Sequence, residues 1–323
     1  MRSAVLGIDV GKSKCQVALL AAGKCRHKSL PNSPEGYAQL SAWLARQGVS
    51  HVHACLEATG PYGDAVALYL HEAGHTVSVV NPARIKNFGK SELVRNKTDK
   101  VDAALIARFC EKQKPLPWTP PPLAFRELQA LGRRLEALQE MHLQESNRLK
   151  AVGKIPSVVA SLTTHLVFLE QEIRKTKQAM KNHIDDHPEL KAQRDLLASI
   201  PGIGDLTAAK FLAEIPVVQN YATARKLAAH AGVSPRQRSS GSSVRGKTRM
   251  SKTGNSRLRK LLYMPAIVAC HHNPIIKNFA QRLRARGKTP MSIIGAAMRK
   301  LVHIAYGVLV SGRPFDPNYA PAH

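Results

Sequence analysis

A proline-rich segment divides the chain into two parts of different character. Residues 115–122 contain five prolines in eight positions, so neither a helix nor a central strand can run through them. Upstream, short apolar runs alternate with helical patterns, whereas downstream leucines recur at intervals of three and four residues. The sequence therefore predicts a linker that separates an α/β region, residues 1–114, from a mainly helical one.

The upstream region has the pattern of an α/β domain with a mixed sheet. Short apolar runs bounded by turn residues predict the strands, and amphipathic stretches predict the helices. The expected strands are residues 4–10, 14–20, 24–30, 51–56 and 76–80, and the expected helices are residues 34–46, 61–73 and 96–112. Three antiparallel strands followed by alternating helices and strands favour this fold class.

The segment after the linker has heptad-like spacing. Apolar residues recur over residues 128–152 and 162–180, and Gly153 and Pro156 break the pattern between them. Two such helices predict an antiparallel helical hairpin or the strands of an oligomeric coiled coil. The alternative is that they pack only on their own domain. We assign residues 115–187 to the linker and this coiled-coil hairpin.

Residues 188–323 are expected to be mainly helical. Residues 256–311 predict three helices, separated near Asn273 and again near Gly287. Ile200-Pro201-Gly202-Ile203-Gly204 fits a helix-hairpin-helix turn, in which the exposed N–H groups of Gly202 and Gly204 would bind a duplex phosphate without reading sequence. The simpler alternative is an ordinary helix–helix turn.

The charge of the chain points to a polyanionic partner. Lysine and arginine number 48 against 22 aspartates and glutamates, which gives a formal net charge of +26. Nucleic acid is the usual partner of so basic a protein. Because aromatic residues make up only 5% of the chain, we expect phosphate contacts to dominate over base stacking, and binding to weaken with salt.

Cysteine usage and hydropathy indicate the compartment. The five cysteines are scattered and form no Cys-x-x-Cys pair, so no zinc site is expected. Their odd number and scatter predict reduced thiols in a bacterial cytosol. The apolar run at the N-terminus is too short for a signal peptide. No stretch reaches about 18 uninterrupted apolar residues, so no membrane span is expected.

Four acidic residues lie where strands and a helix are expected to begin or end. Asp9 interrupts an apolar strand, and a buried carboxylate there is costly unless it is paired or bound to a cation. Glu57 ends another strand, and Asp99 and Asp102 share one face of a helix start. Together they could hold one or two Mg²⁺ ions, or Mn²⁺, against a phosphate. Taken singly, Asp99 could be a helix cap, Asp102 a solvated residue and Glu57 the partner of a lysine.

A serine- and glycine-rich stretch runs from Gln237 to Gly246. Hydroxyls, glycine backbone and arginines suit a bound phosphate, although such stretches are usually mobile linkers. A serine is a weak nucleophile without a base or metal, and the nearest upstream histidine is His230. A nucleophilic serine would therefore need the metal of the acidic cluster. The residues assigned to nucleic-acid contact in and beside this stretch are Arg236, Arg238, Ser242, Ser243, Arg245, Arg249 and Lys252.

These motifs together resemble the DEDD insertion-sequence transposases, whose relatives include the Piv-type DNA invertases. The matching stretches occur in the family's order and span nearly the whole chain. They are Gly7-Ile8-Asp9, Glu57-Ala58-Thr59-Gly60, Asn96 to Asp102, Ile200 to Gly204, Ser240 to Gly246 and Arg249 to Asn255.

The resemblance implies a RuvC-like (RNase H-type) N-terminal domain, a coiled-coil insertion and a helical transposase domain. It implies that Asp9, Glu57, Asp99 and Asp102 bind the metal and that Ser240 is the nucleophile, forming a phosphoserine link to DNA. It further implies a dimer or tetramer, donor and target DNA as substrates, and a structured bridge RNA as guide. From chemistry alone, the neighbouring serines are equal candidates.

Two other functions fit the same residues. A RuvC-like nuclease would cut junction DNA with metal-bound water, and Ser240 would then only bind phosphate. A basic scaffold protein would bind nucleic acid without chemistry, and removal of the acids would leave its activities intact.

Overall fold

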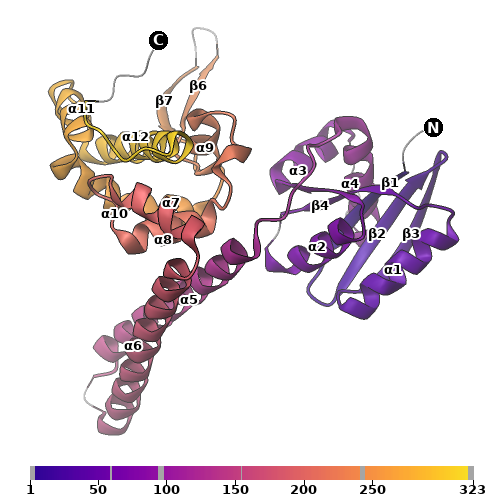
Figure 1. The fold of residues 1–323 in the computed structure, drawn as a ribbon, viewed down its shortest axis with the longest axis horizontal. Helices are drawn as coiled ribbons and strands as arrows, with labels where there is room; N and C mark the ends of the chain where they lie inside the picture. The colour runs from indigo at the N-terminus through magenta and orange to yellow at the C-terminus, as the bar shows by residue number, and fades with distance from the viewer. Residues whose placement is uncertain (1–3, 59, 94–97, 154, 241–243, 319–323) are drawn as a thin grey trace. The chain divides into compact units, whose positions relative to one another are not determined.

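A computed structural model describes residues 4–58, 60–93, 98–153, 155–240 and 244–318, with only the backbone described at residues 61, 238–240 and 244–247. The chain forms two compact units, Met1–Pro120 and Pro121–His323, and the boundary between them in the sequence falls within the predicted proline linker (Figure 1). The further separation of residues 115–187 from residues 188–323 stays a prediction.

The first unit is an α/β domain built on a five-stranded mixed sheet. In the sheet, strand 1 lies between an antiparallel strand 2 and a parallel strand 4, and the spatial order is 3-2-1-4-5. The elements in chain order are β1 (Ala4–Val10), β2 (Lys14–Ala21), β3 (Lys24–Pro31), α1 (Pro34–Arg46), β4 (Val52–Glu57), the 3₁₀ turn η1 (Pro61–Gly63), α2 (Asp64–Glu72), β5 (Thr76–Val80), α3 (Pro82–Ser91) and α4 (Asp99–Gln113).

The predicted mixed sheet is confirmed, with one omission. All five strands lie within one or two residues of their expected positions, and the helix at residues 34–46 is exact. Helix α3 was missed because Gly89 and three basic residues weaken its apolar pattern. The expected helix at residues 61–73 begins as a 3₁₀ turn.

The sheet is covered on both faces. Alternating residues of the strands pack on α1 and α2 on one face, and on α3 and α4 on the other. Gly7 in β1 allows α4 to approach closely, because a Cβ built there would overlap the backbone of Ala103 and Ala107. This approach holds α4 directly against β1.

The second unit is helical apart from one β-hairpin. Its long first two helices lie side by side, as predicted for a hairpin (Figure 1). The elements in chain order are α5 (Leu123–Ala151), α6 (Pro156–Asp185), α7 (Pro188–Ala198), α8 (Asp205–Glu214), η2 (Val218–Asn220), α9 (Ala224–His230), β6 (Pro235–Ser240), β7 (Val244–Met250), α10 (Ser256–His272), α11 (Pro274–Ala285) and α12 (Pro290–Ser311).

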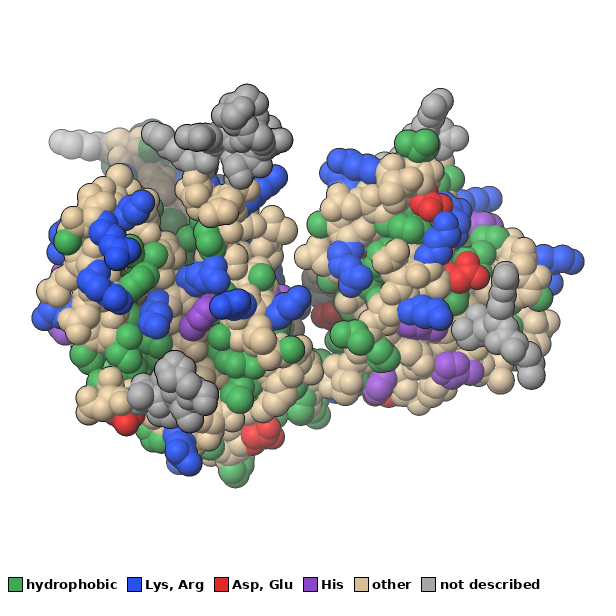
Figure 2. Space-filling model, turned by 90° about the horizontal axis from the view of Figure 1, so that it is seen from above, with side chains coloured by type: hydrophobic (Ala, Val, Ile, Leu, Met, Phe, Trp, Pro, Cys, Tyr) green, Lys and Arg blue, Asp and Glu red, His purple; other side chains and the backbone are tan. Residues whose placement is uncertain are grey.

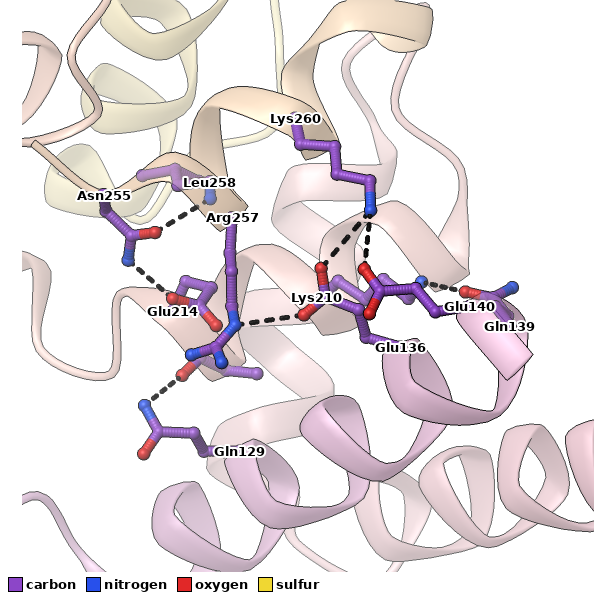
Figure 3. A network of polar contacts seen from close by, with 11 residues as sticks. Gln129, Glu136, Gln139, Glu140, Lys210, Glu214, Asn255, Arg257, Leu258 and Lys260 are labelled. Atoms are coloured by element: carbon purple, nitrogen blue, oxygen red, sulfur yellow. Dashed lines mark hydrogen bonds and ion pairs between the residues drawn. The ribbon is translucent and has the colours of Figure 1, made fainter. Parts of the chain in front are cut away.

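A polar network joins the first helix of this hairpin to α8 and α10 (Figure 3). Glu136 accepts from Arg257 at 3.0 Å and lies 3.7 Å from Lys260, which also contacts Glu140 at 3.2 Å. Lys210 of α8 donates to Gln139 at 3.0 Å. These contacts attach α5 to its own unit. The coiled coil between subunits stays a prediction.

The turn between α7 and α8 is packed against the core. Gly202 has a φ of 107°, and a Cβ there would meet Ala269 and the carbonyl of Pro265 in α10. Asn273 donates to the carbonyl of Pro201 at 3.4 Å. This close packing explains Gly202 without a ligand. Gly204, by contrast, is exposed with open space where a Cβ would lie.

The serine- and glycine-rich stretch was expected to be a loop. Its described residues, 237–240 and 244–246, instead lie in the paired antiparallel strands β6 and β7, which we call the serine hairpin. Arg236 pairs with Arg249, and the backbone of Ser240 pairs with that of Val244. Strand pairing satisfies the backbone even though the sequence lacks the apolar alternation that usually marks strands. Strand β7 is followed by Asn255, the N-cap residue of α10.

Helix α12 is long and apolar enough to cross a membrane, but 44% of its most apolar part is buried inside the second unit. It packs on α7, α9, α10 and α11. Its apolar character is explained by this core position.

Candidate active site

Asp9 and Glu57 lie at the same edge of the sheet on neighbouring strands. Ile8 of β1 pairs with Leu56 of β4 in a parallel register, so the two acids follow one residue later side by side. Asp9 and Gly7 are two residues apart in β1, so they lie on the same face of the sheet. Helix α4 covers this face at Gly7. Both carboxylates therefore occupy the α4 side of the carboxyl edge, and both are half-buried.

Asp99 and Asp102 reach this edge from the first turn of α4. Thr98 caps the helix, its hydroxyl accepting from the N–H of Val101 at 3.3 Å. Asp99 contacts Lys14, which begins β2 beside the end of β1, so the first turn of α4 lies toward Asp9. The start of α4 therefore lies near the carboxyl end of β1, and the joint role of the four acids stays a prediction.

A lysine that the sequence reasoning missed lies in this group. Lys14 begins β2 and contacts Asp99, with Nζ 2.8 Å from Oδ2. The hydrogen bond and charge of Asp99, with a smaller effect of Asp9, raise the pKa of Lys14. The hydrogen bond from Lys14 and its positive charge lower the pKa of Asp99. No local pattern marked this lysine, because its position beside the acids follows from the pairing of β2 with β1.

Asn32 was also missed, and it ties together the two loops that follow Asp9 and Glu57. Its Nδ2 donates to the carbonyl of Gly11 at 3.0 Å and to that of Tyr62 at 3.1 Å. The hydroxyl of Tyr37 donates to its Oδ1 at 2.5 Å. A lone asparagine after a strand gives no sequence signal for such a bridge.

The donor set at this edge suits a hard divalent cation. All four acids offer carboxylate oxygens, which Mg²⁺ and Mn²⁺ prefer, and a cationic ammonium already lies against one of them. Asp99 is exposed and its pKa is lowered, so it is ionised at neutral pH. The residues present therefore fit the metal that the resemblance implies.

The serine hairpin belongs to the second unit. Arg236 and Arg249 are directly paired and exposed, so their side chains leave the same face of the hairpin. Ser240 ends β6, and Arg238 and Arg245 lie within the strands, but only their backbone is described. Ser242 and Ser243 lie outside the described residues. Because the hairpin and the acids are in different units, their meeting stays a prediction.

His230 ends α9 at the surface, and its ring packs beside Tyr221. Burial lowers its pKa, its ring lies 5.2 Å from that of Tyr221, and its carbonyl accepts from the N–H of Asn255 at 2.6 Å. Lys252 has a φ of 57° and an exposed side chain, and its backbone is held by Gly232. Lys252 is thus free to contact a phosphate.

Basic side chains predominate over acidic ones on the faces of both units drawn in Figure 2. This distribution agrees with the formal net charge of +26 and with a nucleic-acid partner.

Comparison with known proteins gives family matches in both units. Residues 194–281 match the Transposase IS116/IS110/IS902 family, and residues 6–152 match a second family described as Transposase. The pilin gene-inverting protein of Moraxella bovis is 33% identical over 320 residues, which is 98% of each chain. The transposase for insertion sequence element IS1328 of Yersinia enterocolitica is 27% identical over 300 residues, 82% of this chain and 83% of that one.

One solved structure, T. thermophilus RuvC in complex with a Holliday junction substrate, also resembles this chain. It is 18% identical and covers 36% of this chain and 99% of its own. The TM-score of 0.28 is too low to establish a shared fold.

Proposed function

This chain belongs to the IS116/IS110/IS902 transposase family and is an enzyme that acts on DNA, and we propose that it cuts and rejoins donor and target DNA at a metal-assisted site. The observation that carries the proposal is the position of Asp9 and Glu57 on neighbouring strands at one edge of the sheet, with the first turn of α4, which carries Asp99 and Asp102, near the end of β1. In this proposal the first unit is a RuvC-like (RNase H-type) catalytic domain.

The four acids would hold Mg²⁺ or Mn²⁺, which when bound would stabilise the attacking and leaving oxygens of the phosphoryl transfer. Asp9 and Glu57 would anchor the metal from rigid strands. Asp99 and Asp102 would complete the site from α4, with Lys14 beside them as a fixed positive charge for the phosphate backbone.

Ser240 would be the nucleophile. Its hydroxyl would form a phosphoserine ester and release a DNA hydroxyl end, so that the bond can be resealed by the reverse attack. Arg236, Arg238, Arg245 and Arg249 would neutralise phosphate charge around it. The exposed Lys252 would add a further phosphate contact, and the turn at Gly204 would hold the duplex backbone.

An assembled state completes the proposal. Ser240 is in one unit and the acids are in the other, so a dimer or tetramer, joined through α5 and α6, could place the hairpin of one subunit on the acids of another. Base readout would lie in a structured bridge RNA that pairs with both DNAs. The basic surface supports both nucleic acids, and we place the enzyme in the bacterial cytosol.

A covalent-trapping assay tests the serine. The protein is incubated with its element DNA, a target and Mg²⁺, then denatured and probed for DNA attached to protein. We expect a linked species in the wild type that is absent from Ser240→Ala. The control Ser199→Ala removes a hydroxyl that contacts only backbone groups, Leu196 and Phe315, and should leave the link intact.

The gathering of the acids within one unit also favours a second function, a junction nuclease that uses water. Water attack leaves no protein–DNA bond. Cleavage that persists in Ser240→Ala without any linked species would replace the first proposal by the second. Loss of cleavage in Asp9→Asn is expected under both, so it tests the metal site separately from the serine.

A further inference from the structure

Two histidines and a glutamate gather at the base of the helical hairpin in the second unit. Glu127 belongs to the second turn of α5, His183 to the last turn of α6, and His187 to the junction with α7. One ligand atom from each lies within 4.8 Å of the other two. Neither the recombination proposal nor the polar network of α5 uses these residues.

Backbone carbonyls hold the protons of both imidazoles. His183 Nε2 lies 2.7 Å from the carbonyl oxygen of Ala124, and His187 Nδ1 lies 2.6 Å from that of His183. A carbonyl can only accept, so each of these nitrogens must donate. In the neutral rings, the lone pairs are therefore left on His183 Nδ1 and His187 Nε2. Metal-ligating histidines are commonly oriented by such carbonyl contacts.

The carboxylate is placed to complete a set of three ligands. Glu127 Oε2 lies 3.8 Å from His183 Nδ1. Ligand atoms around a tetrahedral zinc ion lie roughly 3.3 Å apart, given zinc–nitrogen distances of about 2.0–2.1 Å. The side chain of His183 is 13% exposed and is confined by its neighbours, whereas that of Glu127 is 51% exposed. The Glu127 carboxylate can therefore move the short distance toward His183 that a shared ion requires. The imidazole rings are already close, with centroids 4.4 Å apart.

We propose that Glu127, His183 and His187 form a Zn²⁺ site that joins the start of α5 to the end of α6 and the start of α7. Two imidazoles and one carboxylate suit zinc better than magnesium, which prefers oxygen ligands alone. Three protein ligands leave a fourth position for water. The cysteine pattern predicted no zinc site, and this one uses no cysteine.

The alternative is an ion pair without metal. A protonated His183 beside Glu127 at the carboxyl end of α6 would be stabilised by the carboxylate and the helix dipole. Such a pair needs no zinc and predicts no zinc-dependent change in stability. The two explanations are therefore separated by a binding measurement.

Zinc titration of the full, untagged chain tests the site. The protein is stripped with a chelator, and excess Mg²⁺ is added so that the carboxylates of the first unit do not bind zinc. Zinc uptake is then followed by competition with a coloured chelator. We expect one zinc ion per chain and a zinc-dependent rise in the melting temperature. Cobalt substitution should give the visible spectrum of a tetrahedral nitrogen and oxygen site.

Matched variants decide the outcome. His187→Gln should bind no zinc at concentrations that saturate the wild type. His142→Gln should bind as the wild type does, because His142 pairs with Glu170 at 3.3 Å on the same hairpin without belonging to the cluster. Glu127→Ala, an exposed position that a helix tolerates, guards against a folding defect and should weaken binding with an unchanged circular dichroism spectrum. Absence of zinc binding in the wild type, or undiminished binding in His187→Gln or Glu127→Ala, would overturn the site.

Discussion

Lys14 Nζ lies 2.8 Å from Asp99 Oδ2, and this contact connects the hairpin after β1 to the first turn of α4. Both side chains are more than half exposed, so the contact contributes little to stability. Its importance is local. It places a fixed positive charge beside the carboxylates that we propose as metal ligands.

Removal of this charge should strengthen metal binding. In Lys14→Gln, the carboxylates lose a competing cation, and we expect Mg²⁺ affinity, measured by calorimetry, to rise several-fold at low salt. Lys12→Gln removes an equal charge from the same turn without removing the Asp99 ion pair, and should change the affinity less. Equal affinities in Lys14→Gln and the wild type would show that the ammonium does not act on the site.

The close approach of α4 to β1 should not tolerate a side chain at position 7. In Gly7→Ala, the new Cβ would overlap the backbone of Ala103 and Ala107, and we expect a loss of about 3 kcal/mol in the free energy of unfolding. Both tryptophans, Trp43 and Trp118, lie in the first unit, so denaturant unfolding followed by tryptophan fluorescence reports on this unit alone.

Gly132→Ala is the matched control for that change. Gly132 lies inside helix α5, and its new Cβ would make an ordinary van der Waals contact with Ala213 of α8. Because alanine favours a helix over glycine, we expect a gain of up to about 1 kcal/mol, followed by circular dichroism. A stable Gly7→Ala protein with full activity would mean that α4 can shift without disturbing the acids.

Asn255 should stabilise the second unit in two separable ways. Its Oδ1 caps α10 by accepting from Leu258 N at 3.0 Å, and its Nδ2 donates to Glu214 at 2.5 Å. Asn255→Ala loses both and should cost about 2 kcal/mol. Asn255→Ser keeps a capping oxygen and should cost about half as much. Thermal unfolding measures both variants, and equal losses would show that the cap contributes nothing.

Acid should destabilise the second unit through His303. Burial, followed by the charges of Arg299, Lys300 and Arg225, lowers the pKa of His303 below its ordinary value of about 6.5. The folded state therefore binds this proton less tightly than the unfolded chain. Stability present above about pH 6.5 is lost as the pH falls toward the folded pKa.

The variant His303→Gln isolates this effect. Chemical unfolding at about pH 7.5 and about pH 5 should show a smaller acid-induced loss in His303→Gln than in the wild type. The wild-type loss will also contain contributions from His230, whose pKa burial lowers as well. If the loss of unfolding free energy between the two pH values is as large in His303→Gln as in the wild type, His303 does not contribute to the acid destabilisation.

Local patterns predicted most of the first unit. Apolar runs located every strand of this unit, and the positions of Asp9, Glu57, Asp99 and Asp102 within a strand, at a strand end and at a helix start suggested that they could converge on one point. The same patterns failed for residues 235–250, where polar side chains conceal a β-hairpin because strand pairing there does not depend on an apolar face. The sequence also could not separate a phosphate-binding turn at Gly202 from one packed against Ala269.

The sequence by itself determined the charge of the chain, its division at the prolines, the five strands of the first unit and the positions of the four acids on its elements, because these follow from local periodicity and composition. Only the tertiary structure decided which distant residues meet. It set Lys14 against Asp99, fitted α4 onto Gly7, and brought His183 and His187 to Glu127 across the helical hairpin. Such contacts depend on packing between elements far apart in the chain, and no local pattern encodes them.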